Sequence, residues 1–257
     1  MSQQAVTDHA LPPVLPQLYV GPLEDLAPAR LCNAEPDGVM GATLLTPACL
    51  DELLTHFGRR YGHGDRRAVA SLWSKWHFSY VVAVGLAANL LLDRDLPLAI
   101  DSLHLIQDQE GQTTGMIMRH AGSPLAMRAN SLRFATLIDG HLTPLIEALA
   151  NLSGASPKVF WSNAGNYFEY FAHTLADHPL ALPNANASAL ALLESKTLSE
   201  GRRNPLYRPV RYLPGTDDKP QRVRRLCCIR YLIGELGYCS NCPLTCRSRG
   251  PRYGVAS

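Results

Sequence analysis

Residues 66–92 read RRAVASLWSKWHFSYVVAVGLAANLLL. Apolar residues recur at helical spacing in the first half of this stretch, where Trp73, Trp76 and Tyr80 lead into a continuous apolar run. The run from Val81 to Leu92 is twelve residues long, well short of the roughly 20 residues that cross a bilayer. The sequence therefore predicts a central buried helix here and no transmembrane span.

Other helices and a small β element flank this stretch. Thr46 and Pro47 favour a helix start, because threonine caps a helix and proline suits its first turn. Residues 97–119 hold two apolar runs around a turn sequence, which predicts a β-hairpin. Helical spacing recurs in residues 128–152, after Ser156-Pro157, and in residues 187–198. We expect a mainly α fold of the α+β class, with a helical body, a small β-hairpin and a loop-rich C-terminal cysteine segment.

Charge and cysteine are unevenly distributed along the 257 residues, although the whole chain carries only +2. Residues 202–257 contain twelve Lys and Arg against three Asp and Glu, a net +9, which leaves −7 for residues 1–201. Five of the seven cysteines also lie in this last part. We therefore divide the chain into a mainly helical body, residues 1–201, and a basic cysteine segment, residues 202–257. The prolines of this segment favour an extended, loop-like course.

The compartment follows from the N-terminus and the cysteines. The first residues show no basic stretch followed by an apolar run, so no secretory signal is predicted and the cytoplasm is expected. Thiols stay reduced there, and a dense cysteine cluster then indicates a metal site more than a disulfide framework.

The cysteine motif is C-C-x10-C-x2-C, formed by Cys227, Cys228, Cys239 and Cys242. Four thiolates suit an iron–sulfur cluster or a tetrahedral zinc, and reduced thiols or disulfides without metal are a third interpretation. Adjacent cysteines cannot both point at one centre from a regular helix or strand, so a special local backbone is needed. In a two-iron cluster the adjacent pair need not share an iron. We interpret Cys246 as a bystander.

The chain resembles the FhuF-type ferric siderophore reductases. The resemblance rests on the cysteine motif, the arginine-rich approach to it and the Cys-Pro-Leu ending, and extends to residues 71–76, 160–163 and 206–211. It implies a 2Fe-2S cluster with Cys227, Cys228, Cys239 and Cys242 as ligands. It also implies an oxidoreductase of the cytosol that passes one electron to Fe(III) held by a hydroxamate-type siderophore. Hydroxamate oxygens are hard ligands that hold Fe(II) far less tightly, so reduction releases the iron.

The partners follow from what the sequence lacks and from its charge. No nucleotide-binding motif is visible, so the electron is expected from a separate, unidentified donor protein. The arginines would raise the potential of the cluster and steer an acidic donor or an anionic ferric complex. Sparse aromatic interleaving argues against a nucleic-acid partner, and peripheral association with the inner membrane stays open. Candidate contacts to the siderophore or the donor are Arg224, Arg225, Arg230, Trp73, Lys75, Trp76, Trp161 and Asn163.

Two other hypotheses compete with the reductase. The first is a zinc-stabilised module whose basic tail binds a protein or nucleic acid. The second is a relative from siderophore biosynthesis that kept the scaffold and changed the chemistry. The absence of a phosphate-binding signature argues against the second.

Overall fold

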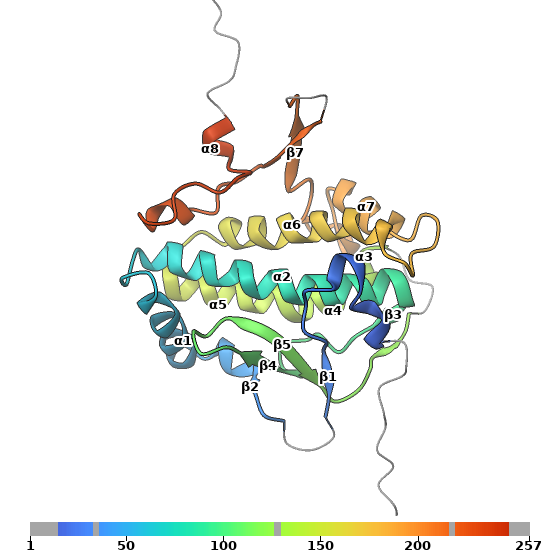
Figure 1. Cartoon of the computed structure of the whole chain (residues 1–257), viewed down its shortest axis with the longest axis horizontal. Helices are drawn as coiled ribbons and strands as arrows, with labels where there is room; N and C mark the ends of the chain where they lie inside the picture. Colours follow the sequence, from blue (N-terminus) through green and yellow to red (C-terminus); the bar gives the residue numbers. More distant parts are fainter. Residues whose placement is uncertain (1–14, 33–35, 126–129, 216–218, 247–257) are drawn as a thin grey trace, which may run out of the picture.

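The computed structural model describes residues 15–32, 36–125, 130–215 and 219–246 (Figure 1). Its longest element is α2 (Arg66–Leu92), which has the bounds that the sequence predicts. The Asp65 side chain caps its start by accepting bonds from the Arg67 and Ala68 backbone amides. The helix ends where Asp93 adopts a left-handed backbone, with φ of 53°. Sequence therefore determines both ends of the central helix.

By length and composition α2 is one helix that could cross a membrane, but 72% of its most apolar 18-residue stretch is buried inside the protein. Helices α1 (Pro47–Arg59), α5 (Thr143–Ser153) and α6 (Pro157–Thr174) pack around it. This covering makes α2 the core helix of the fold. The predicted start of α1 at Thr46 is confirmed, although the Thr46 side chain makes no capping bond.

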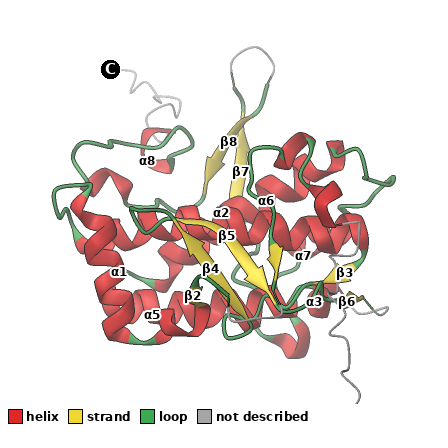
Figure 2. Cartoon of the chain, turned by 60° about the horizontal axis from the view of Figure 1, so that its bottom comes forward, coloured by secondary structure: helices red, strands yellow, loops and turns green. Residues whose placement is uncertain are grey.

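A four-stranded sheet lies against one side of these helices (Figure 2). Its strand order is β1 (Arg30–Leu31), β5 (Thr113–Met118), β4 (Leu103–Gln107) and β2 (Val39–Met40). The β4–β5 pair is antiparallel and confirms the predicted hairpin, whereas β1 pairs parallel with β5. The two outer strands hold two residues each, too few for a period-2 pattern to indicate them.

The remaining short elements connect these layers. In chain order, the helices and strands are β3 (Arg94–Asp95), β6 (Ser123–Pro124), α3 (Asn130–Arg133), α4 (Ala135–Leu137), a π-helical turn (Ile138–Leu142) and α7 (Ala187–Glu194). The 3₁₀ turns are Leu15–Leu18, Gly21–Leu23, Gly41–Leu45, Leu175–Asp177, Ser199–Gly201 and Arg230–Leu232.

The cysteine segment lies on the other side of the helices from the sheet (Figure 1). It begins with an antiparallel hairpin of β7 (Val210–Leu213) and β8 (Gln221–Arg224), and it ends with α8 (Pro243–Cys246). The prolines led us to expect an extended loop for this region, but they flank the strands instead of interrupting them. The mainly α fold with a little β structure is confirmed. The proline-rich residues 1–14 and the basic residues 247–257 lie outside the described part of the chain.

Candidate metal centre

The four cysteines of the motif meet as two sulfur pairs. Cys227 Sγ lies 3.8 Å from Cys242 Sγ, and Cys228 Sγ lies 3.8 Å from Cys239 Sγ. Cys228 and Cys242 are buried, each with only 1% of its surface exposed, whereas Cys227 and Cys239 are half-buried. Each pair thus combines one buried and one partly accessible thiol.

The backbone directly after the adjacent cysteines, Cys227 and Cys228, has an unusual conformation. Ile229, directly after the adjacent pair, has φ of 54°, in the left-handed region that a β-branched residue rarely adopts. This turn brings the Ile229 amide to 3.3 Å from Cys227 Sγ, to which it donates. On the other side, the Cys242 amide donates to Cys239 O at 3.1 Å and closes a tight turn. The special backbone that adjacent cysteines require is therefore present.

Residues 226–242, which we call the cysteine loop, lie on helices α2 and α6. Polar side chains of the two helices, Ser71, Ser162 and Asn163, form what we call the platform beneath this loop. Ser71 Oγ on α2 donates to Cys228 O at 2.7 Å, and Ser162 Oγ on α6 donates to Leu226 O at 3.0 Å. Asn163 Nδ2 donates to Ser71 Oγ at 3.0 Å and links the two helices. The loop is thus held by its main chain, which leaves the sulfurs free to serve as ligands.

Arg224 is a buried cation within this platform, with 1% of its surface exposed. Its Nη2 donates to Asn163 Oδ1 and to Ser162 Oγ, while its Nε is buried without a hydrogen-bond partner. Among the residues that the structure describes, no carboxylate forms an ion pair with it. A buried charge without a partner is costly, so this position calls for compensating negative charge nearby.

The neighbouring Cys228 thiolate provides that negative charge. The pKa of Cys228 is lowered to about 5, mainly because its sulfur bonds with Cys239, and further because Arg224 and Lys75 attract its thiolate. The pKa of Lys75 is lowered, because burial outweighs the attraction of the Cys228 and Cys239 sulfurs. The two cations therefore favour the deprotonated form of Cys228, the form that binds metal, whereas burial raises the pKa of Cys227 to about 11 and the bond with Cys228 raises the pKa of Cys239.

The sulfur positions fit a group with two metal positions. Two thiolates on one tetrahedral metal, with metal–sulfur bonds of about 2.3 Å, lie about 3.8 Å apart. Both pairs have this separation. In the described part of the chain, no three His, Cys, Asp or Glu side chains surround one common metal position. Each pair would give two thiolates to one tetrahedral metal, and thiolates suit iron–sulfur clusters and zinc.

The remaining cysteine of the segment belongs to neither sulfur pair. Cys246 is on α8, with its Sγ 3.9 Å from Thr245 Oγ1. Its interpretation as a bystander stays a prediction.

Two predicted contact residues have structural positions in the core. Trp73 is fully buried, its indole N–H donates to Gly111 O at 2.9 Å, and it stacks on His77. Asn163 is also fully buried, within the platform. We correct the expectation that these two side chains contact a substrate or donor, because neither side chain is exposed to solvent. Asn163 instead bonds to Ser71, which holds the cysteine loop, and to the guanidinium of Arg224.

Arg230 and Lys75 lie by the cysteine loop, and Trp76 lies on the exposed side of α2. The Arg230 guanidinium donates to the carbonyls of Leu236, Gly237 and Tyr238, so it fixes the loop between the two halves of the motif. Lys75 is half-buried, and Trp76 is 50% exposed. Of these three, Trp76 is the side chain most accessible to a partner.

Trp161 and Arg225 line a cavity of about 810 Å³, which we call the basic cavity. Among its described lining residues six are cationic and one, Asp139, is acidic. The cationic ones are Lys158, Lys196, Arg202, Arg203, Arg208 and Arg225. Of these only Arg225 was a predicted contact, because the others come from separate parts of the sequence and form no motif.

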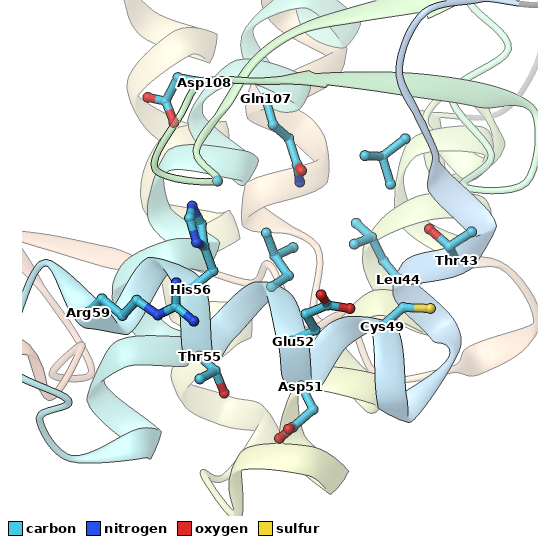
Figure 3. A pocket seen from close by; sticks show the side chains of 13 residues that line it. Thr43, Leu44, Cys49, Asp51, Glu52, Thr55, His56, Arg59, Gln107 and Asp108 are labelled. Atoms are coloured by element: carbon cyan, nitrogen blue, oxygen red, sulfur yellow. The ribbon is translucent and has the colours of Figure 1, made fainter.

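A second cavity, of about 610 Å³, lies between α1 and the β4–β5 turn (Figure 3). Cys49, Glu52 and His56 line it from α1, and Gln107 and Asp108 from the sheet side. No residue predicted from the sequence as a site residue lines this cavity. The predicted site and the second cavity are therefore distinct.

Comparison with known proteins supplies the family. The model of the family described as ferric iron reductase FhuF-like transporter matches residues 71–219. The ferric siderophore reductase of Escherichia coli (strain K12) is 27% identical over 183 residues, which cover 70% of this chain and 67% of that protein. The family match begins at Ser71 on the platform and ends before the first cysteine of the motif. Because this match spans more than half of the chain, the protein belongs to the ferric iron reductase FhuF-like family and is an oxidoreductase that acts on ferric iron.

Proposed function

We propose that this protein reduces Fe(III) bound by a hydroxamate-type siderophore in the cytosol, using a 2Fe-2S cluster held by Cys227, Cys228, Cys239 and Cys242. The observation that carries the proposal is the separation of 3.8 Å within each of two sulfur pairs. In such a cluster each iron takes two cysteine sulfurs, so two pairs are required and adjacent cysteines bind different irons. The relative named a ferric siderophore reductase supports the substrate class.

The reaction takes one electron from a donor protein and adds it to the ferric ion of the siderophore. Hydroxamate oxygens are hard ligands matched to Fe(III), and they bind the Fe(II) product far less tightly. The iron therefore dissociates while the chelator stays chemically intact. When bound, a 2Fe-2S cluster supplies one electron at a time, which matches this one-electron change.

The chain's own residues prepare the site for this chemistry. Ser71 and Ser162 hold the loop through its carbonyls, and the burial of Cys228 and Cys242 keeps water away from one sulfur of each pair. Arg224 places a fixed positive charge beneath the thiolates. Positive charge there would favour the reduced state of a bound cluster, which is more negative, and so raise the reduction potential of the cluster.

A variant series tests the ligand assignment. Protein purified without oxygen is expected to show visible absorption that bleaches with dithionite, about two irons per chain and an EPR signal of a spin-1/2 centre. Cys228→Ser and Cys239→Ser are expected to lose these signals and the reduction of ferric hydroxamates. Cys246→Ser and Cys49→Ser are the matched controls, because neither sulfur belongs to a pair.

Two outcomes would contradict the proposal. Retention of the cluster and full activity in Cys228→Ser or Cys239→Ser would remove that residue from the ligand set. A colourless protein that binds zinc stoichiometrically would favour the zinc-stabilised binding module, and the search would then turn to its partners.

A further inference from the structure

The basic cavity has the size and position of a small-molecule site. Its volume of about 810 Å³ lies within the range of roughly 300–1,000 Å³ that is usual for ligand pockets. Its wall includes Arg225 and Leu226, the two residues that precede Cys227. Ser162, which also lines the cavity, holds Leu226 O at 3.0 Å. A molecule bound in the cavity would therefore contact the chain directly before the first cysteine.

The charge of the cavity is only partly neutralised. Arg202 pairs with Asp139 at 2.9 Å, and Arg208 forms an ion pair with Glu194. Four lining cations have no carboxylate partner in the part of the chain that the structure describes. They are Lys158, Lys196, Arg203 and Arg225. A concave surface with an excess of one sign concentrates ligands of the opposite charge.

These cations come from three separate segments that converge on one cavity. Lys158 is on α6, Lys196 and Arg203 flank the turn after α7, and Arg225 follows β8. Each of the four is exposed. Like charges repel one another, so gathering four cations at one cavity costs electrostatic free energy. An anionic ligand bound there would relieve this repulsion. Trp161 and Tyr207 add aromatic surface to the same wall.

We propose that the basic cavity binds the ferric siderophore and selects a chelate with net negative charge, such as a hydroxamate siderophore that also carries carboxylates. This inference rests on the proposed function. Three hydroxamates neutralise Fe(III), so a simple trihydroxamate complex is neutral and gains nothing from four unpaired cations. Free carboxylates make the complex anionic and allow charge-assisted bonds with Lys and Arg.

Binding is tested without electron transfer by using gallium(III), which is not reduced under these conditions. The probes are the gallium complexes of a neutral trihydroxamate and of a citrate-bridged dihydroxamate that retains free carboxylate. Calorimetry on the full-length protein is expected to show roughly tenfold tighter binding of the anionic complex, and this preference is expected to shrink as salt rises. Quenching of tryptophan fluorescence that disappears in Trp161→Phe locates the ligand.

The variants separate cavity charge from general charge. Lys196→Glu and Arg203→Glu are expected to abolish the preference for the anionic complex. Arg59→Glu is the matched control, because Arg59 is an exposed cation that lines the second cavity. Equal affinity for both complexes, or a preference that survives Lys196→Glu and Arg203→Glu, would overturn the inference and leave the reductase proposal intact. The reductase proposal fails separately if the protein binds the gallium complexes but reduces no ferric siderophore.

Discussion

Two buried histidines, far from the cysteines in sequence, predict how stability depends on pH. His141 Nδ1–H donates to Leu98 O at 2.7 Å, so its Nε2 accepts from His77 Nε2–H at 2.8 Å. His77 Nδ1 in turn accepts from Thr113 Oγ1 at 2.9 Å. This chain of bonds is complete only when both rings are neutral. Burial lowers the pKa of His141 to about 4, and burial together with the neighbouring His141 lowers the pKa of His77 well below its ordinary value.

The sign of the effect follows from proton binding. The ordinary histidine pKa is 6.5, so between about pH 4 and 6.5 the unfolded chain binds protons that folded His141 does not. The free energy of unfolding therefore falls as the pH falls from about 6.5 to about 4. Above pH 6.5 the contribution of neutral His141 to stability is fully present. For His141 alone the loss is about 2 kcal/mol at pH 5 and about 3 kcal/mol below pH 4. His77 adds a loss of the same sign.

The assay is urea unfolding of the wild type and of His141→Asn at pH 7.5 and pH 5.0. Effects of pH on the cysteine loop occur in both proteins and cancel in the comparison. The variant is less stable at pH 7.5, but it lacks the titration, so the gap to the wild type is expected to narrow by about 2 kcal/mol at pH 5.0.

A non-titrating neighbour provides the control for this experiment. Leu142→Ala removes packing beside His141, where Leu142 is fully buried, and is expected to keep a constant gap to the wild type at both pH values. If the gap between the wild type and His141→Asn stays the same at both pH values, the assignment of two neutral buried rings is refuted.

Three further predictions concern the platform and the segment before the cysteines. Arg224→Met is expected to lower the midpoint potential of the cluster more than Arg225→Met, because solvent screens the exposed Arg225; equal shifts in an EPR-monitored redox titration would contradict this. Gly165→Ala is expected to lower the free energy of unfolding by about 1–3 kcal/mol, because the added Cβ would lie 2.7 Å from Pro209 Cβ; an unchanged urea midpoint would show that this contact relaxes. Ser71→Ala is expected to cost about 1–3 kcal/mol and to speed loss of iron to a chelator, since a buried carbonyl of the cysteine loop loses its donor; wild-type rates would exclude a role in holding the loop.

The elements predicted from sequence are those that local pattern determines. The bounds of α2 followed from its helical spacing and continuous apolar run, and the structure shows that Asp65 and Asp93 cap and end it. The hairpin of β4 and β5 was predictable because its two strands and its turn are contiguous. The C-C-x10-C-x2-C spacing likewise indicated a metal site before any contact was known.

The features that sequence did not reveal depend on tertiary neighbours. Arg224 and Arg225 are adjacent and chemically identical, yet Arg224 is buried and Arg225 exposed because Ser162 and Asn163 on α6 bind the guanidinium of Arg224. Trp73 and Trp76 differ in the same way, since only Trp73 faces the sheet side and bonds to Gly111. The basic cavity joins distant segments, so no linear motif could indicate it.

The two sulfur pairs are nested, because Cys228 and Cys239 lie inside the span from Cys227 to Cys242. Only ten residues separate the inner pair, so bringing these two sulfurs together closes a short loop at a small cost in chain entropy. The helices hold this loop through two of its carbonyls and also through Ile233, which is buried in the same apolar core as the helices. Closing the loop therefore also buries Ile233, which couples the assembly of the two sulfur pairs to the packing of the helical body.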